Sequence, residues 1–104
     1  MAEGHPQQAE PLFREVIKAQ PGYESAHFEL GRALLEQGDA SGAIESLETA
    51  AKLVPDHDAT YFQLSQAYRR AGRTQEAQQA LAAYQKLIET NRLKKRESLE
   101  IDKP

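Results

Sequence analysis

The side chains with the clearest chemical potential are three histidines and the acidic residues beside one of them. His57 stands between Asp56 and Asp58, whereas His5 and His27 have no adjacent carboxylate. An imidazole flanked by carboxylates could serve as an acid/base group or as a metal ligand. Consecutive residues in a turn point in different directions, however, and no second cluster completes a coordination set. We therefore expect no catalysis, no metal and no cofactor, and we expect Asp58 to cap a helix.

The composition removes several other classes of function. Cysteine is absent, which excludes disulfides, thiolate zinc sites and cysteine nucleophiles. The 16 acidic residues outnumber the 13 Lys and Arg, so the net charge of -3 gives no general attraction to nucleic acid or to acidic membranes. The chain has no apolar run near the roughly 20 residues of a membrane span, and its first residues lack the apolar core of a signal peptide. We expect a soluble protein with no membrane partner, and a cytoplasmic location is favoured.

A short basic stretch is the feature that best fits nucleic-acid contact. Residues 92–104 contain five positive and three negative side chains, and Arg92, Lys94, Lys95 and Arg96 lie close together. Phosphate tracking needs many basic contacts, usually with aromatic side chains between them. We interpret residues 92–96 as a solvated helix face and keep nucleic-acid contact as a remote alternative.

These residues are carried by an internal repeat of 34 residues. Eight positions recur at this shift, from Phe28 and Phe62 to Leu53 and Leu87. Such a period is typical of a helical solenoid, in which each unit stacks on its neighbours. Four earlier residues anticipate the second half of the repeat and so indicate a truncated first unit. The identical pairs are Phe28/Phe62, Leu30/Leu64, Ala33/Ala67, Gly38/Gly72, Ala43/Ala77, Leu47/Leu81, Lys52/Lys86 and Leu53/Leu87, and the early residues are Gly4, Ala9, Lys18 and Pro21.

Apolar residues within each unit recur at steps of three and four, which predicts helical hairpins. Gly38 and Gly72 follow the first helix of each hairpin, where a left-handed residue can close it. Asp39 and Thr74 are expected to cap the helices that follow. We predict five antiparallel helices at residues 6–20, 24–37, 40–53, 58–71 and 74 onward. The helix before Pro21 and the helix before Pro55 end there because proline cannot continue the hydrogen-bond ladder.

The last helix is predicted to be unusually long. Glu89 occupies the position where Pro21 and Pro55 stood, so nothing stops the helix before the charged residues 92–100. We expect it to continue past Asn91 and to fray before Pro104. The predicted organisation is a truncated unit at residues 1–23, complete repeats at 24–57 and 58–91, and a helical extension with a frayed tail at 92–104.

Residues 4–91 resemble the tetratricopeptide repeat family. The pattern of large, small and proline residues is carried by His27, Leu30, Gly31, Leu34, Ala43, Leu47, Ala50 and Pro55, then by Tyr61, Leu64, Ser65, Tyr68, Ala77 and Leu81, with Ala9, Phe13 and Pro21 in the truncated unit. The resemblance implies an all-α superhelix of antiparallel hairpins that acts as a non-enzymatic scaffold for a protein or peptide. Gly31 and Ser65 are small where Ala43 and Ala77 must approach closely, and Leu47 and Leu81 fill the space between layers.

In this family the first helices of the hairpins line a concave groove, and the resemblance places the partner-binding residues there. We expect two apolar anchors, Phe28 and Phe62, beside three arginines, which suits an acidic peptide. The alternative is that both Phe residues complete the packing between repeats. The expected groove residues are Ser25, Phe28, Arg32, Leu35, Glu36, Ala59, Phe62, Gln66, Arg69 and Arg70.

The branch of the family that grips chaperone C-termini is not matched. Its Lys and following Asn are replaced by Phe28 and Arg32, its next Asn corresponds to Gln63, and its third first helix is absent. We therefore do not expect chaperone-tail binding.

The truncated unit raises a separate possibility. Its apolar stripe should have packed on a missing first helix, which suggests the C-terminal end of a longer scaffold and a surface for homodimerisation. The stripe consists of Ala9, Leu12, Phe13, Val16 and Ile17.

Overall fold

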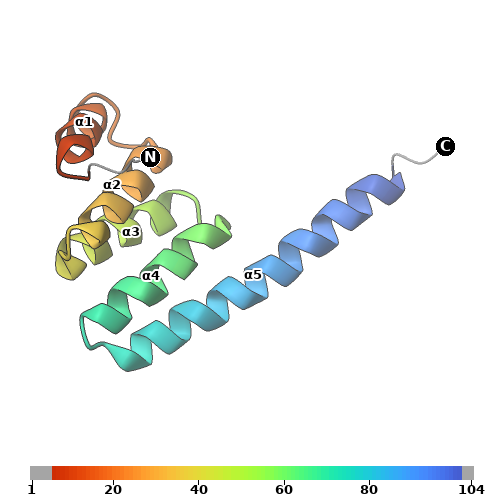
Figure 1. The fold of residues 1–104 in the computed structure, drawn as a ribbon. Coiled ribbons are helices and arrows are strands. Elements are labelled where there is room, and N and C mark those ends of the chain that lie inside the picture. The colour runs from red at the N-terminus through yellow and green to blue at the C-terminus, as the bar shows by residue number, and fades with distance from the viewer. Residues whose placement is uncertain (1–5, 102–104) are drawn as a thin grey trace.

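The computed structural model describes residues 6–101, which form five α-helices joined by short turns (Figure 1). The helices are α1 (Pro6–Ala19), α2 (Glu24–Glu36), α3 (Ala40–Leu53), α4 (Asp58–Arg70) and α5 (Thr74–Ile101). This confirms the predicted all-α fold of five helices. His5 and the tail at 102–104 lie outside the described residues.

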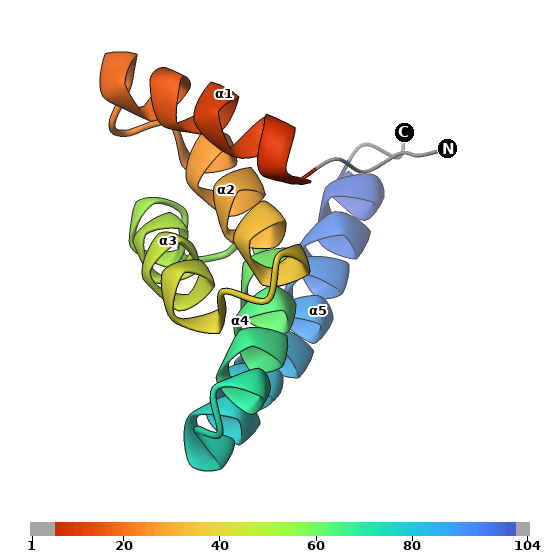
Figure 2. The same ribbon diagram turned by 60° about the vertical axis from the view of Figure 1, so that its left-hand side comes forward.

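Each helix packs against the next one along the chain, and α2 also touches α4. Figures 1 and 2 show the result as a stepwise stack, from α1 at one end to α5 at the other. The hairpins α2–α3 and α4–α5 are its repeating units. Because α4 lies against both helices of the preceding hairpin, the two hairpins share one core. The buried cluster contains Leu30, Leu34, Leu35, Ala43, Ile44, Leu47, Leu64, Ala67, Tyr68, Ala77 and Ala80.

Helices α2 and α3 approach each other closely at Gly31, as the small-residue pattern predicted. A Cβ atom at Gly31 would lie 2.5 Å from Cγ of Leu47, so only glycine fits there without a shift. Ala43 and Leu47 are fully buried beside it. The second hairpin differs, because Leu81 is 39% exposed. The prediction that Leu81 fills space between layers was wrong, because no helix within residues 6–101 covers its face of α5.

The turns inside the hairpins follow the predicted chemistry. Gly38 and Gly72 have φ angles of 89° and 79°, in the left-handed region that favours glycine. The Asp39 carboxylate accepts a hydrogen bond from the Gly42 amide at 2.9 Å and so caps α3.

Two other predicted caps were wrong. His57 occupies the position before α4, so Asp58 is the first helical residue. Thr74 is likewise the first residue of α5, which places Arg73 before the helix. Acidic side chains in the first turn, Asp58 and Glu76, instead complement the positive end of each helix dipole.

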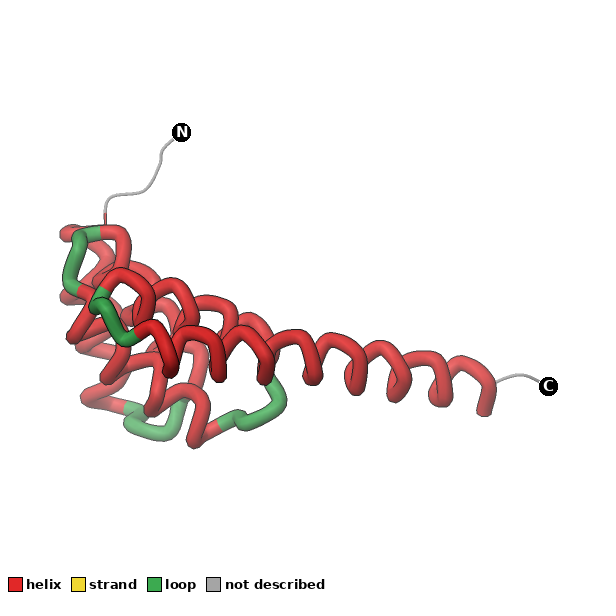
Figure 3. Tube along the Cα trace, turned by 90° about the horizontal axis from the view of Figure 1, so that it is seen from below, coloured by secondary structure: helices red, strands yellow, loops and turns green. Residues whose placement is uncertain are grey.

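Helix α5 contains 28 residues and runs without interruption past Asn91 to Ile101, as predicted from the missing proline. Figure 3 shows its C-terminal half extending well beyond the other four helices. Leu93, on this extension, is 47% exposed. None of the helices in the described residues combines the length and apolar content that a membrane crossing requires.

Candidate partner-binding face

A hollow of about 240 Å³ lies between the first helices of the two hairpins. Residues on α2 and α4 line it because both helices turn the same face, one repeat apart, to the same side. We call it the α2–α4 hollow, and its lining residues are Arg32, Leu35, Glu36, Phe62, Gln63, Gln66 and Arg70. Six of these are among the ten residues expected in the groove. Gln63 was not, although the comparison with chaperone-binding repeats had pointed to that position.

The four other expected residues lie outside this hollow. Arg69 lines a different groove, between α4 and α5. Ser25 is exposed and Ala59 is half-buried, and Phe28 packs against the core. Leu35 lines the hollow but is only 6% exposed, so its side chain belongs mainly to the core.

The two equivalent Phe residues have different surroundings. The Phe28 ring lies 4.9 Å from the His57 ring, and the Arg32 guanidinium lies 6.0 Å from its centroid. Phe62 is 39% exposed and contacts the Tyr84 ring at 5.2 Å. Phe28 is therefore partly enclosed between the hairpins, whereas Phe62 stands at the surface.

The charged groups of the hollow are held in place by neighbours. Arg70 Nη1 donates to the Leu35 carbonyl at 3.1 Å, which links α4 to the end of α2. Arg32 pairs with Glu29 at 3.1 Å. That pair is exposed, so it contributes at most about 1 kcal/mol and can yield to a ligand carboxylate.

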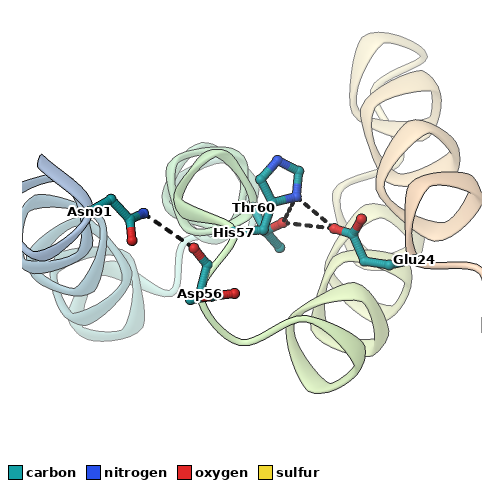
Figure 4. Close-up of polar contacts among 5 residues, drawn as sticks. All are labelled: Glu24, Asp56, His57, Thr60 and Asn91. Carbon is teal, nitrogen blue, oxygen red and sulfur yellow. Dashed lines mark hydrogen bonds and ion pairs between the residues drawn. The ribbon is translucent and has the colours of Figure 1, made fainter. Parts of the chain in front are cut away.

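The histidine cluster noted in the sequence forms structural contacts (Figure 4). His57 Nδ1 donates to the Glu24 carboxylate at 2.7 Å, and the buried Thr60 hydroxyl donates to the same oxygen at 3.5 Å. These bonds tie the turn after α3 to the start of α2. On the other side, Asn91 donates to the Asp56 carbonyl and to the Asp58 carboxylate, each at 3.3 Å.

His57 and Asp58 therefore point to different partners. His27 Nε2 donates to the Pro21 carbonyl at 2.7 Å and holds the turn before α2. Within the described residues, no group of three or more His, Asp or Glu side chains is placed to hold a metal ion.

A partly buried polar contact also joins the two hairpins. The Tyr68 hydroxyl donates to the Glu48 carboxylate of α3. Burial raises the pKa of the Tyr68 phenol well above its usual range, and the negative charge of Glu48 raises it further. This bond stabilises the packing of α4 on α3.

The apolar stripe of α1 is only partly available. Phe13 and Ile17 pack against the core, and Ala9 and Val16 are half-buried. Leu12 alone is largely exposed, at 67%. The face that a preceding helix would cover therefore presents one large apolar side chain.

Comparison with solved structures identifies similar repeat proteins. A structure of MamA from MSR-1 is 28% identical with a TM-score of 0.79, and the match covers 83% of this chain and 49% of that one. A structure of MamA from AMB-1 is 29% identical with a TM-score of 0.78, covering 82% and 50%. A further MamA crystal structure, 23% identical with a TM-score of 0.78, supports the fold alone and covers 83% and 50%. The chain spans about half the length of these MamA chains.

No curated protein sequence matches the chain. Two family models do, both described as the tetratricopeptide repeat, over residues 1–58 and 34–92. Such repeats generally serve as non-enzymatic scaffolds for protein–protein interaction. The paired helices, the 34-residue period and these two matches together show that the chain belongs to the tetratricopeptide repeat family.

Proposed function

We propose that this protein holds an acidic segment of a partner protein in the α2–α4 hollow, without catalysing a reaction. The observation that supports the proposal is the hollow itself, to which two successive hairpins contribute adjacent polar and apolar side chains. A peptide that lies across it would contact both hairpins at once. Binding would therefore depend on the stacking of the repeats and not on either hairpin alone.

The charges of the hollow favour an acidic ligand. Arg32 and Arg70 line it, against the single carboxylate of Glu36. The bond from Arg70 to the Leu35 carbonyl fixes the guanidinium and leaves further N–H donors for a carboxylate. A guanidinium that is already oriented loses little conformational entropy when it binds.

Phe62 supplies the apolar anchor. It is 39% exposed and borders the hollow, so a ligand side chain can cover it. Phe28 is the less accessible of the two, because it already packs against the core and against His57. We therefore assign the anchor to Phe62 and a packing role to Phe28.

The test is a selection of peptides from a random library on the immobilised protein, followed by affinity measurements. We expect the selected peptides to be rich in Asp and Glu. The double variant Arg32→Glu, Arg70→Glu should bind them at least about tenfold more weakly, which corresponds to about 1.4 kcal/mol. The matched control is Lys18→Glu, Lys52→Glu, which makes the same charge change on the exposed surface of α1 and α3. If both double variants lost the same affinity, the loss would be due to the change in net charge, and this result would contradict the assignment of the site.

A second candidate function is homodimerisation through α1, favoured by the 67% exposure of Leu12. A dimer of this kind should dissociate in the Leu12→Glu variant, as measured by sedimentation velocity. A monomeric wild-type protein at high concentration would remove this candidate.

A further inference from the structure

A second groove, of about 320 Å³, lies between α4 and α5 at the end of the stack. We call it the end groove. Its apolar centre includes Phe62 and Leu81, each 39% exposed, and Ala77 between them. Its eight lining residues are Phe62, Ser65, Gln66, Arg69, Thr74, Ala77, Gln78 and Leu81.

The same groove exists one repeat earlier, and there it is filled by a helix. Moving each lining residue back by 34 positions leads to Phe28, Gly31, Arg32, Leu35, Ala40, Ala43, Ile44 and Leu47. Leu35, Ile44 and Leu47 share one buried cluster with Leu64 and Tyr68 of α4. The packing of α4 therefore indicates that this groove accommodates a helix with large apolar side chains at positions i, i+3 and i+7. In α4 these are Tyr61, Leu64 and Tyr68.

Two equivalent leucines, one in each groove, differ in how far a neighbouring helix covers them. Leu47 is fully buried under α4, whereas Leu81 remains 39% exposed. Although α5 is long, it runs straight and does not fold back over α4 (Figure 1). Within the described residues, Leu81 therefore remains exposed in the groove.

The end groove differs from its internal counterpart in a way that suits reversible binding. The Phe, Ala and Leu of the centre are the same in both, but Arg69 stands where Leu35 stands in the first hairpin and Gln78 stands where Ile44 does. Protein–protein interfaces that form and dissociate commonly have an apolar centre and a polar rim, because the rim stays hydrated when the partner is absent. A groove that is always covered, like the internal one, carries apolar residues at these two places.

We propose that the end groove binds an amphipathic helix of a partner protein, whose apolar ridge resembles that of α4. The internal groove indicates how such a helix would lie, because Leu64 and Tyr68 of α4 share one buried cluster with Leu47. Leu81 is the equivalent of Leu47, so apolar side chains at the Leu64 and Tyr68 places on an incoming helix would bury it.

The end groove is a surface additional to the α2–α4 hollow. Phe62 and Gln66 border both, but Leu81, Arg69 and Gln78 line the end groove only. A variant at Leu81 therefore tests this inference separately from the function proposed above.

The probe is a synthetic peptide with the sequence of residues 58–71, labelled with a fluorophore. Its matched control is the same peptide carrying Leu64→Gln, which interrupts the apolar ridge. Titrated with the full chain and followed by fluorescence anisotropy, the unaltered peptide should bind more tightly than the control. On the protein, Leu81→Gln should weaken the unaltered peptide about tenfold. Leu53→Gln, which alters a leucine of α3 that is also 39% exposed, should leave the affinity unchanged.

Two outcomes would overturn the proposal: equal affinity of the two peptides for the wild-type protein, or binding of the unaltered peptide that Leu81→Gln does not weaken. A wild-type dimer that Leu81→Gln dissociates would also overturn it, because a second copy of this chain would then occupy the groove.

Discussion

The close approach of α2 and α3 leads to a definite expectation for Gly31→Ala. A Cβ atom at this position would lie 2.5 Å from Leu47 Cγ, 2.9 Å from Cδ2 and 3.3 Å from Cδ1. Carbon atoms in good contact are about 3.5–4.0 Å apart, so the two side chains must separate by about 1 Å. Leu47 is fully buried and has no free space to move into.

The magnitude follows from two opposed terms. Overpacking a close-packed core costs about 1–3 kcal/mol. Replacing glycine by alanine within a helix contributes about 1 kcal/mol in the other direction. Because Leu47 is fully buried and the Cβ would lie 2.5 Å from it, the overpacking cost falls near the upper end of its range, at about 3 kcal/mol. We therefore expect a net loss of about 2 kcal/mol in the free energy of unfolding, measured by urea denaturation followed through the helical circular dichroism. A chain of this size should lose several degrees of melting temperature for each kcal/mol.

Two further variants separate the steric effect from the backbone effect. At Gly22 no atom lies within 4 Å of an added Cβ, and its φ is not positive, so Gly22→Ala should be neutral or slightly stabilising. In a Leu47→Ala background the clash partner is gone, and Gly31→Ala should then cost nothing. A Gly31→Ala protein as stable as wild type, or one equally destabilised in both backgrounds, would refute the steric argument.

Two other substitutions probe the packing of the stack. Leu47→Ala should lower the free energy of unfolding by about 2–5 kcal/mol, because the Leu47 side chain is fully buried. Leu81→Ala should lower it by less than about 1 kcal/mol, because Leu81, the equivalent residue of the next repeat, is 39% exposed. Denaturation midpoints compare the two variants directly. Burial and the hydrogen bond to Glu48 raise the pKa of Tyr68 in the folded protein above its value in the unfolded chain. The neutral phenol therefore stabilises the fold fully below about pH 10, the pKa of an unperturbed tyrosine. This stability is lost as the pH rises further, because Tyr68 ionises in the unfolded chain before it does in the folded one. Urea denaturation across this range should show a steeper loss for wild type than for Tyr68→Phe, and parallel curves would contradict the assignment.

The sequence carried more information about the fold than about the surface. Turn glycines, the prolines that follow α1 and α3, and the missing proline in α5 each act within a few residues, so their effects could be predicted from local chemistry. The capping of α4 and α5 could not be placed, because helix starts shift by a residue or two when several polar side chains compete for the position. At the start of α4, His57 stands before the helix and Asp58 within it.

The candidate site was predictable only in part. The repeat placed Arg32, Phe62 and Arg70 on the same side of successive first helices, and the α2–α4 hollow contains all of them. The sequence made Phe28 and Phe62 equivalent, but the His57 ring packs on Phe28, whereas Phe62 remains 39% exposed. That contact depends on a turn 29 residues away in the chain, beyond the reach of any local pattern.

The 34-residue period, the helical spacing and the turn residues alone determined that this chain forms stacked helical hairpins with a long final helix. Those signals act through the backbone and through neighbours within a turn or two, so every copy of the repeat expresses them equally. The tertiary structure decided which copies of the same residue are buried, because burial depends on whether another helix packs against them. Leu47 is covered by α4, while Leu81, identical in sequence position within its repeat, faces an open groove. The surfaces available to a partner arise from this difference.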